Sequence, residues 1–248
     1  MSCSEIQGSA RLSQSVEGSK AWMSVAIAFV ILIAWALSLS IIFRLDLQVL
    51  SWPFKVLLLL WQAFLYSGLF VTAHDAMHGV VFPLNRRMND WIGTVMLWLY
   101  GLFSYQELLK RHTQHHQYPA TTADPDYYIE ERSNLWVWYS SFITRYWSWK
   151  RFAMLVLSFH LMHRFGGVPE FNLAWGWVYP SVLSSFHLFF FGTYLPHRKP
   201  TLGYGNRHCA TTLPRPLLLS LLACYHFGYH HEHHEYPDVP LWQLPQIY

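Results

Sequence analysis

The chain has 248 residues, of which 53% are apolar and only 12% are charged. Water-soluble domains carry roughly 25% charged residues, so this composition excludes an ordinary soluble protein and indicates one that folds in a membrane. The net charge of +3 comes without a basic stripe, so nucleic acid is not an expected partner. Cys3, Cys209 and Cys224 form no spaced framework, which argues against a disulfide scaffold and against a thiolate metal site.

The first part of the chain contains the clearest candidate spans. Residues 1–21 are polar and are expected to form a flexible tail, without the apolar stretch of a signal peptide, ahead of a single domain over residues 22–248. The uncharged run from Trp22 to Phe43 is long enough to cross a hydrocarbon core, which needs about 20 residues. A second span is expected from about Val56 to Ala73, directly before a pair of histidines.

The rest of the chain offers weaker apolar segments. Residues 91–105 are apolar but short, and predict an interfacial or re-entrant helix. A third span is expected between residues 135 and 165, where basic residues interrupt the pattern and residues 152–162 are the most apolar. A fourth is expected from about Trp175 to Leu195, and residues 214–229 predict an amphipathic or partly buried helix.

The basic residues indicate the orientation. With four spans and both termini in the cytoplasm, all of the 17 lysines and arginines except Arg44, Lys55 and Arg164 fall on the cytoplasmic side. The sequence therefore predicts an all-α, multi-pass membrane protein whose termini and histidine motifs are cytoplasmic.

Most of the 15 histidines are concentrated in three motifs of one geometry. The motifs are HxxxH at His74 and His78, HxxHH at His112, His115 and His116, and HxxHH at His230, His233 and His234. On a helix, positions i, i+3 and i+4 share a face, so each motif presents two or three imidazoles together. Because imidazole is a ligand of iron, zinc, copper and nickel, each motif is half of a metal site.

The three motifs supply eight imidazoles, and His197, at the end of the fourth expected span, supplies a ninth. This number is too large for one ion and suits two ions with positions left open for dioxygen. The alternative is that the histidines simply sit at the membrane interface. That explanation would account for one such motif, but it accounts poorly for three motifs on the same side of the membrane.

Residues around the motifs are candidates for an outer layer, because a metal-bound histidine usually donates its other N–H to a carboxylate or carbonyl. The acidic candidates are Asp75, Asp124, Asp126, Glu232 and Glu235. Solvent exposure explains Asp126 and Glu232 equally well. His226 shares the helical face of His230 and is a further outer candidate, whereas His231 points away from that face.

The three-motif pattern, from about Ala73 to His234, resembles the membrane fatty acid desaturase and hydroxylase superfamily. Longer stretches, residues 73–80, 186–199 and 225–246, are similar to the β-carotene ketolases of bacteria and cyanobacteria, and residues 115–129 fit the same family. This resemblance implies a four-span bundle with a cytoplasmic helical cap that holds a di-iron centre. It implies that the nine histidines are the ligands and that dioxygen is the co-substrate.

The resemblance also implies a reaction at carbon 4 of a β-ionone ring. Two successive hydroxylations and loss of water would convert β-carotene through echinenone to canthaxanthin. The chain has no GxGxxG or P-loop motif, so the electrons are expected from a separate protein, a ferredoxin.

A carotenoid has almost no polar handle and is expected to enter sideways from the bilayer into an apolar tunnel. Candidate wall residues are His187, Phe189, Phe190, Phe191 and Tyr194, together with the helix expected over residues 91–105. Lipid contact or core packing is the alternative for each aromatic residue, and a hydrogen-bonded core position is the alternative for His187.

Other functions fit the same motifs. A carotenoid ring hydroxylase or a lipid desaturase or hydroxylase of the superfamily could use the same metal site on a different C–H bond. A membrane metal transporter is the alternative from another class. Transporters hold such groups near the bilayer midplane, whereas these motifs follow the ends of apolar runs.

Overall fold

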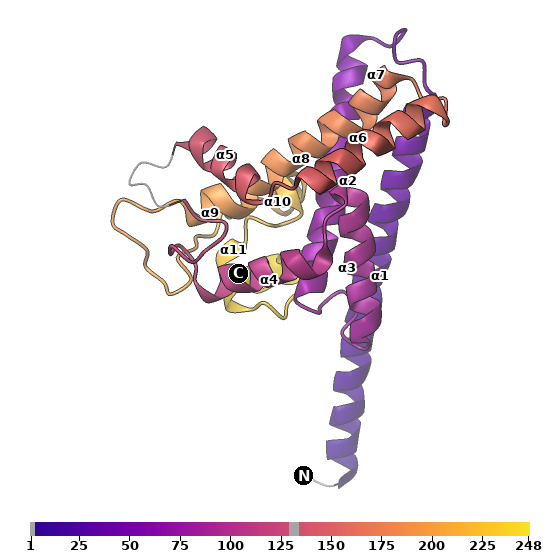
Figure 1. Ribbon diagram of the computed structural model, residues 1–248. Helices are drawn as coiled ribbons and strands as arrows, with labels where there is room; N and C mark the ends of the chain where they lie inside the picture. The colour runs from indigo at the N-terminus through magenta and orange to yellow at the C-terminus, as the bar shows by residue number, and fades with distance from the viewer. Residues whose placement is uncertain (1–2, 129–133) are drawn as a thin grey trace.

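The computed structural model describes residues 3–128 and 134–248, with side chains from Gly18 onwards. Within these residues all the regular structure is helical, as the apolar runs of the sequence predicted (Figure 1). In the folded chain, the C-terminal end of one long helix lies beside helical segments from the middle and the end of the sequence.

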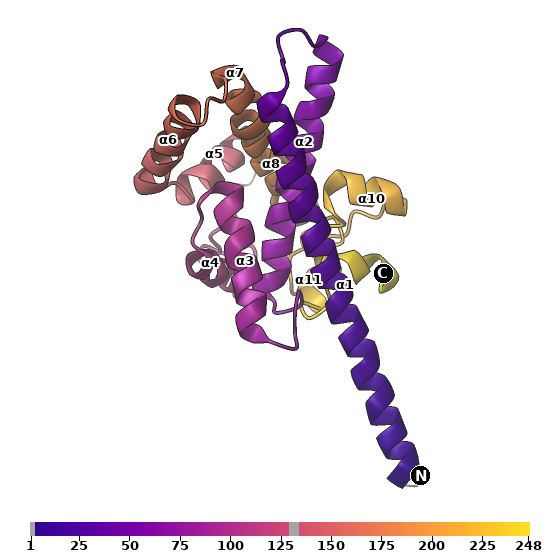
Figure 2. The same ribbon diagram turned by 90° about the vertical axis from the view of Figure 1, so that its right-hand side faces the viewer.

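Helices α1 (Cys3–Arg44) and α2 (Trp52–Met77) are the longest and pack against each other. Among the described helices, these two are long and apolar enough to cross a membrane, α1 over Gly18–Arg44 and α2 over its whole length. Helix α1 begins before its apolar run, within the segment expected to be a flexible tail, and its first turns extend beyond the rest of the fold (Figure 2). No proline interrupts residues 3–44, so nothing in the backbone ends the helix at the polar boundary.

Helix α3 (Arg86–Gly101) doubles back alongside α2, and α4 (Tyr105–Gln117) follows after a short turn (Figure 2). The close approach of α3 depends on Gly93, where an added Cβ would lie 2.8 Å from Cβ of Ala76 and 2.4 Å from the Tyr105 ring. Ser104 caps α4 by accepting a hydrogen bond from the backbone N–H of Glu107. Together these contacts place α4 near the C-terminal end of α2.

The region of residues 135–165, where a third span was expected, contains two helices. It is divided into α5 (Leu135–Arg145) and α6 (Trp149–Arg164), neither of which reaches the length of α1 or α2. The division follows from Ser148, whose hydroxyl accepts from the N–H of Arg151 and starts a new helix. No side chain of α6 is buried, although the helix is rich in apolar residues such as Leu157 and Leu161.

Residues 170–197 form one continuous helical run that includes the fourth expected span. The run consists of α7 (Glu170–Leu173), η1 (Ala174–Val178), α8 (Tyr179–Phe189), η2 (Phe190–Tyr194) and α9 (Leu195–His197), where η1 and η2 are π-helical. Pro180 and Pro196 each follow a π-helical segment by two residues. A proline cannot donate the helical hydrogen bond, and the wider π turns accommodate that gap.

The C-terminal part contains α10 (Leu217–Cys224), α11 (His230–Glu235) and the 3-10 helix η3 (Leu241–Gln246). Helix α10 buries Ser220 and Cys224 but exposes four leucines, which agrees with the partly buried helix expected over residues 214–229. Tyr225 and His226 both adopt left-handed backbone conformations, with φ of 48° and 67°. They turn the chain sharply from α10 towards α11.

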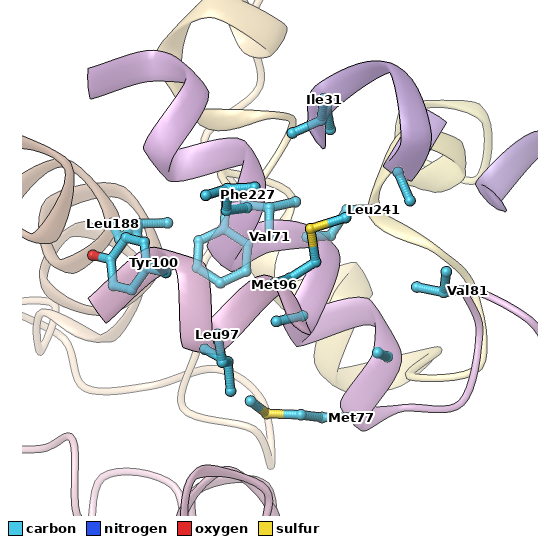
Figure 3. Close-up of a cluster of buried hydrophobic side chains, with 14 of the residues drawn as sticks. Ile31, Val71, Met77, Val81, Met96, Leu97, Tyr100, Leu188, Phe227 and Leu241 are labelled. Atoms are coloured by element: carbon cyan, nitrogen blue, oxygen red, sulfur yellow. The ribbon is translucent and has the colours of Figure 1, made fainter. Parts of the chain in front are cut away.

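The core joins these parts around the C-terminal half of α2, which contributes Val71 and Met77 (Figure 3). Val71 and Met77 from α2 pack with Leu97 from α3, Leu188 from α8 and Phe227 from the C-terminal part. This packing holds α11 against the end of α2, and thereby places the histidine motifs side by side.

Candidate metal centre

The three motifs lie on helices, as their spacing predicted. The HxxxH motif is at the C-terminal end of α2, and the HxxHH motifs are on α4 and α11. His197 ends α9. The structure therefore brings all nine histidines together from four helical segments that are distant in the sequence.

Eight of the nine histidines form two groups of four. The first group is His74, His78, His112 and His233, and the second is His115, His197, His230 and His234. In each group the potential ligand atoms all lie within 4.8 Å of one another. His116 lies between the groups, with Nε2 3.0 Å from Nε2 of His233 and its ring 4.1 Å from the ring of His234.

The distances between ring nitrogens fit shared metal ions. Nε2 of His78 lies 2.7 Å from Nε2 of His112, and Nε2 of His230 lies 3.2 Å from Nε2 of His234. Two imidazole nitrogens bound to one ion at about 2.1 Å, and roughly at right angles, lie about 3 Å apart. The nitrogens therefore converge closely enough to be ligands of a common ion.

Several of these nitrogens are buried and have no hydrogen-bond partner among the described residues, although buried polar atoms in proteins are normally paired. They are both ring nitrogens of His74, Nε2 of His197, and Nδ1 of His230, His233 and His234. Burial and the neighbouring histidines hold the pKa of His112, His116, His230, His233 and His234 below the usual value. These imidazoles are uncharged, as metal ligands must be, so the residues present fit a metal centre.

Asp124 orients His115. Its two carboxylate oxygens lie 2.9 and 3.0 Å from Nδ1 of His115, and they also accept from the backbone N–H groups of Ala120 and Asp126. Burial lowers the pKa of His115, but the hydrogen bond and charge of Asp124, with the charge of Asp126, raise it above the usual value. Nδ1 is therefore occupied as a donor, and Nε2 is left for a metal ion.

Backbone carbonyls provide another support, which no sequence pattern predicts. Nδ1 of His197 donates to the carbonyl of Cys209 at 2.8 Å, and the hydroxyl of Tyr204 donates to the carbonyl of His197. The ring of His208 lies 5.7 Å from the ring of His234, and its Nε2 is bonded to the carboxylate of Glu235 at 2.7 Å. The loop that contains Tyr204, His208 and Cys209 therefore forms one side of the centre.

The other outer candidates are placed differently. Asp75 accepts from the N–H of Leu241 and lies 3.7 Å from Nδ1 of His74, too far for a hydrogen bond. Asp126 accepts from the hydroxyl of Tyr146 and lies 4.0 Å from Nδ1 of His115.

Glu232 and His226 face away from the two groups of histidines. Both carboxylate oxygens of Glu232 accept from the hydroxyl of Thr212 at 2.7 Å. Nδ1 of His226 is bonded to the hydroxyl of Ser220 at 3.0 Å, and His226 belongs to neither group. These contacts stabilise α11 and the turn before it.

A cavity of about 470 Å³ ends on the histidines. His74, His112, His115 and His230 line one end of it. The remaining wall is mainly aromatic and aliphatic and comes from helices α2 to α6, from α8 and η2, and from Phe227. Val182 and Trp147 also line the cavity and are exposed, so it reaches the outer surface.

The candidate substrate residues divide between two sides of the helical run. Phe189 lines the large cavity, and Tyr100 and Phe103 line it from the segment expected over residues 91–105. His187, Phe190 and Phe191 instead line a separate cavity of about 350 Å³, and His187 is bonded to the hydroxyl of Ser67. Tyr194 packs against Trp138 and Phe189. Consecutive residues of a helix point in different directions, so one cavity cannot receive all of them.

Comparisons with known proteins agree with this site. The family model of fatty acid desaturases matches residues 50–175 and 141–248. A β-carotene ketolase of Paracoccus sp. (strain PC1) is 40% identical over 200 residues, which are 77% of this chain and 78% of that protein. A β-carotene 4-ketolase of Protosiphon botryoides is 38% identical over 79% of this chain, and a zeaxanthin 4-ketolase of Chlamydomonas reinhardtii is 36% identical over 79%. The chain covers 51% and 44% of these two algal proteins.

Proposed function

The chain belongs to the fatty acid desaturase family and, within it, to the β-carotene ketolases, and we propose that it converts β-carotene through echinenone to canthaxanthin. The single observation that carries this proposal is an apolar cavity that ends on converging histidines. Each hydroxylation at carbon 4 consumes one dioxygen, two electrons and two protons and releases one water. Two hydroxylations give a geminal diol, which loses a further water to form the ketone.

We infer that the metal is iron, with one ion held by each group of four histidines and His116 available to either. The all-imidazole donor set and membership of the desaturase family support this assignment. Bound iron supplies the activation of dioxygen, which protein side chains alone do not perform. The chain's own residues fix the ligands, since Asp124 orients His115 and the carbonyl of Cys209 orients His197.

The cavity supports the role of positioning the ring. Its wall of apolar side chains excludes water and leaves the ring few orientations, so that carbon 4 can be held towards the histidine end. The cavity is too small for a whole carotenoid of two rings and a long polyene, so the remainder of the molecule extends through the mouth near Val182.

We propose four membrane spans, namely α1, α2, α6 and residues 170–197. The amide of Asn172 donates to the carbonyls of Ile42 and Leu45, which places the start of the last run beside the end of α1. The histidines lie at the other end of α2 and of the last run. Helix α6 rises about 24 Å, most of a hydrocarbon core of about 30 Å, and its exposed apolar side chains suit lipid.

With these spans, both termini and the metal centre face the cytoplasm, where most basic residues lie. An external ferredoxin is then the proposed electron donor, approaching from the cytoplasmic side. Residues 22–248 act as a single oxygenase domain, with a carotenoid supplied from the bilayer.

The experiment that tests this function is expression in a bacterium that accumulates β-carotene, followed by chromatography and mass spectrometry of the pigments. Echinenone and canthaxanthin are expected, and a double variant His115→Ala, His116→Ala should form neither. Zeaxanthin in their place would move the function to ring hydroxylation. Unchanged β-carotene in cells that contain the iron-loaded protein would contradict the proposal and favour a lipid substrate.

A further inference from the structure

The hydroxyl group of Thr193 stands in the cavity wall without a hydrogen-bond partner. The residue lines the cavity and is only 8% exposed, and its hydroxyl forms no hydrogen bond within the part of the chain that the structure describes. Other helical threonines behave differently. Thr72, Thr94 and Thr113 each donate to the carbonyl four residues earlier, at 2.9, 2.7 and 2.8 Å.

The π-helical segment η2 explains this difference. In a π turn the backbone N–H bonds the carbonyl five residues earlier, which moves the carbonyl that a helical threonine would otherwise use. The segment is also fixed in place, because a Cβ added at Gly192 would lie 2.0 Å from the Phe227 ring. The free hydroxyl is therefore a feature of a tightly packed backbone.

Thr193 lies at the histidine end of the cavity. It precedes His197 by four residues in the same helical run, and its neighbour Gly192 packs against Phe227, whose ring lies 5.5 Å from that of His230. Carbons 3 and 4 of a β-ionone ring are neighbours. When carbon 4 faces the histidines, a substituent on carbon 3 must face the wall immediately around them.

Two other hydroxyl groups of the wall already have partners. The hydroxyl of Tyr139 is paired with Ser185 at 2.7 Å, and the hydroxyl of Tyr146 donates to Asp126. An unsubstituted ring offers no group that could pair with Thr193, so its hydroxyl remains unsatisfied when such a ring is bound. A ring that carries a hydroxyl at carbon 3 would supply the missing partner.

We propose that Thr193 is a specificity-determining residue whose hydroxyl hydrogen-bonds the 3-hydroxyl of a β-ionone ring and thereby favours ring-hydroxylated carotenoids. The proposal rests on the proposed function and adds the residue that selects between substrates. Its contribution is one neutral hydrogen bond, which corresponds to a selectivity factor of about five.

The test compares Thr193→Val, which removes the hydroxyl and keeps the shape, with Thr193→Ser, which keeps a hydroxyl. Membranes containing each protein receive β-carotene and zeaxanthin together, and the ratio of kcat/KM values follows from the 4-keto products of each. In Thr193→Val the ratio of zeaxanthin to β-carotene use should fall about fivefold, and Thr193→Ser should retain most of it. Thr94→Val, on the exposed side of α3, is the matched control and should leave the ratio unchanged.

An unchanged ratio in Thr193→Val would overturn the inference and leave the proposed function standing. The inference would also be overturned if Thr193→Val accumulated 4-hydroxylated pigment from β-carotene while the ratio of zeaxanthin to β-carotene use stayed the same. That result would show that the Thr193 hydroxyl binds the oxygen at carbon 4 and not the one at carbon 3. If the wild type forms no 4-keto product from either pigment, the proposed function fails and the inference fails with it.

Discussion

Asp124 and His115 form a buried pair in which the carboxylate holds Nδ1 of the imidazole at 2.9 Å, while two backbone N–H groups hold the carboxylate. The pair fixes the direction of the remaining ring nitrogen towards His197, His230 and His234. Loss of such an outer partner commonly weakens metal binding 10- to 100-fold, roughly.

Asp124→Asn should therefore lower the iron affinity by about tenfold or more, because a neutral amide accepts more weakly and can present its NH2 group to the ring. The measurement is iron retained per chain during titration with a chelator. Glu232→Gln is the matched control, since Glu232 bonds Thr212 and no clustered histidine. Equal retention by the two variants would show that Asp124 does not support the centre.

Gly192→Ala should destabilise both the fold and the centre. An added methyl group would overlap the Phe227 ring, which packs at 4.8 Å from the ring of His74 and 5.5 Å from that of His230. Overpacking of this kind costs about 1–3 kcal/mol, so a lower Tm and a lower iron content are expected. Gly205→Ala is the control, because an added Cβ there meets no atom within 4 Å. Wild-type Tm and iron content in Gly192→Ala would contradict this packing.

Acidification should destabilise the metal-free protein. Five clustered histidines, His112, His116, His230, His233 and His234, have pKa values lowered by burial and by one another. Histidine in an unfolded chain has a pKa of about 6.5. Below that pH these five histidines take up protons in the unfolded state but not in the folded state, so the free energy of unfolding falls as the pH falls.

The measurement is the Tm of chelator-treated protein between about pH 8 and pH 5, where the fall should begin near the ordinary histidine pKa. His116→Gln removes one of these groups and should show a smaller fall. A Tm that stays constant or rises on acidification would show that the imidazoles are not held neutral.

Val182→Trp should slow the reaction without removing the metal. Val182 is exposed and lines the mouth of the cavity, so a larger ring there narrows the entrance. A roughly tenfold lower kcat/KM for β-carotene is expected, as for other changes that misplace a substrate, with unchanged iron content. Val178→Trp is the control, since Val178 is exposed one turn earlier and is not part of the cavity wall. Equal rates in both variants would place the entrance elsewhere.

The histidine motifs show how far sequence reasoning reaches here. Helical periodicity predicted that each motif presents its imidazoles on one face, and the structure brings all of them together. The division into two groups was not predictable. His112 and His115 share α4 yet belong to different groups, because that division depends on how four helical segments meet.

Other differences have equally local causes. The basic residues that interrupt the third expected span flank the turn between α5 and α6, where Ser148 starts a new helix. The carbonyl of Cys209 that bonds His197 belongs to the backbone, so the type of side chain at position 209 does not predict this contact. The free hydroxyl of Thr193 depends on a π-helical segment, which the presence of Pro196 alone does not predict.

The most direct test of the di-iron centre is the number and kind of metal ions in the purified protein, measured by elemental analysis after expression in iron-rich medium and purification in detergent. We expect two iron ions per chain, and fewer in variants that remove a histidine from either group, such as His78→Ala or His234→Ala. One ion per chain, or zinc in place of iron, would contradict the proposed di-iron centre and the oxygen chemistry that depends on it.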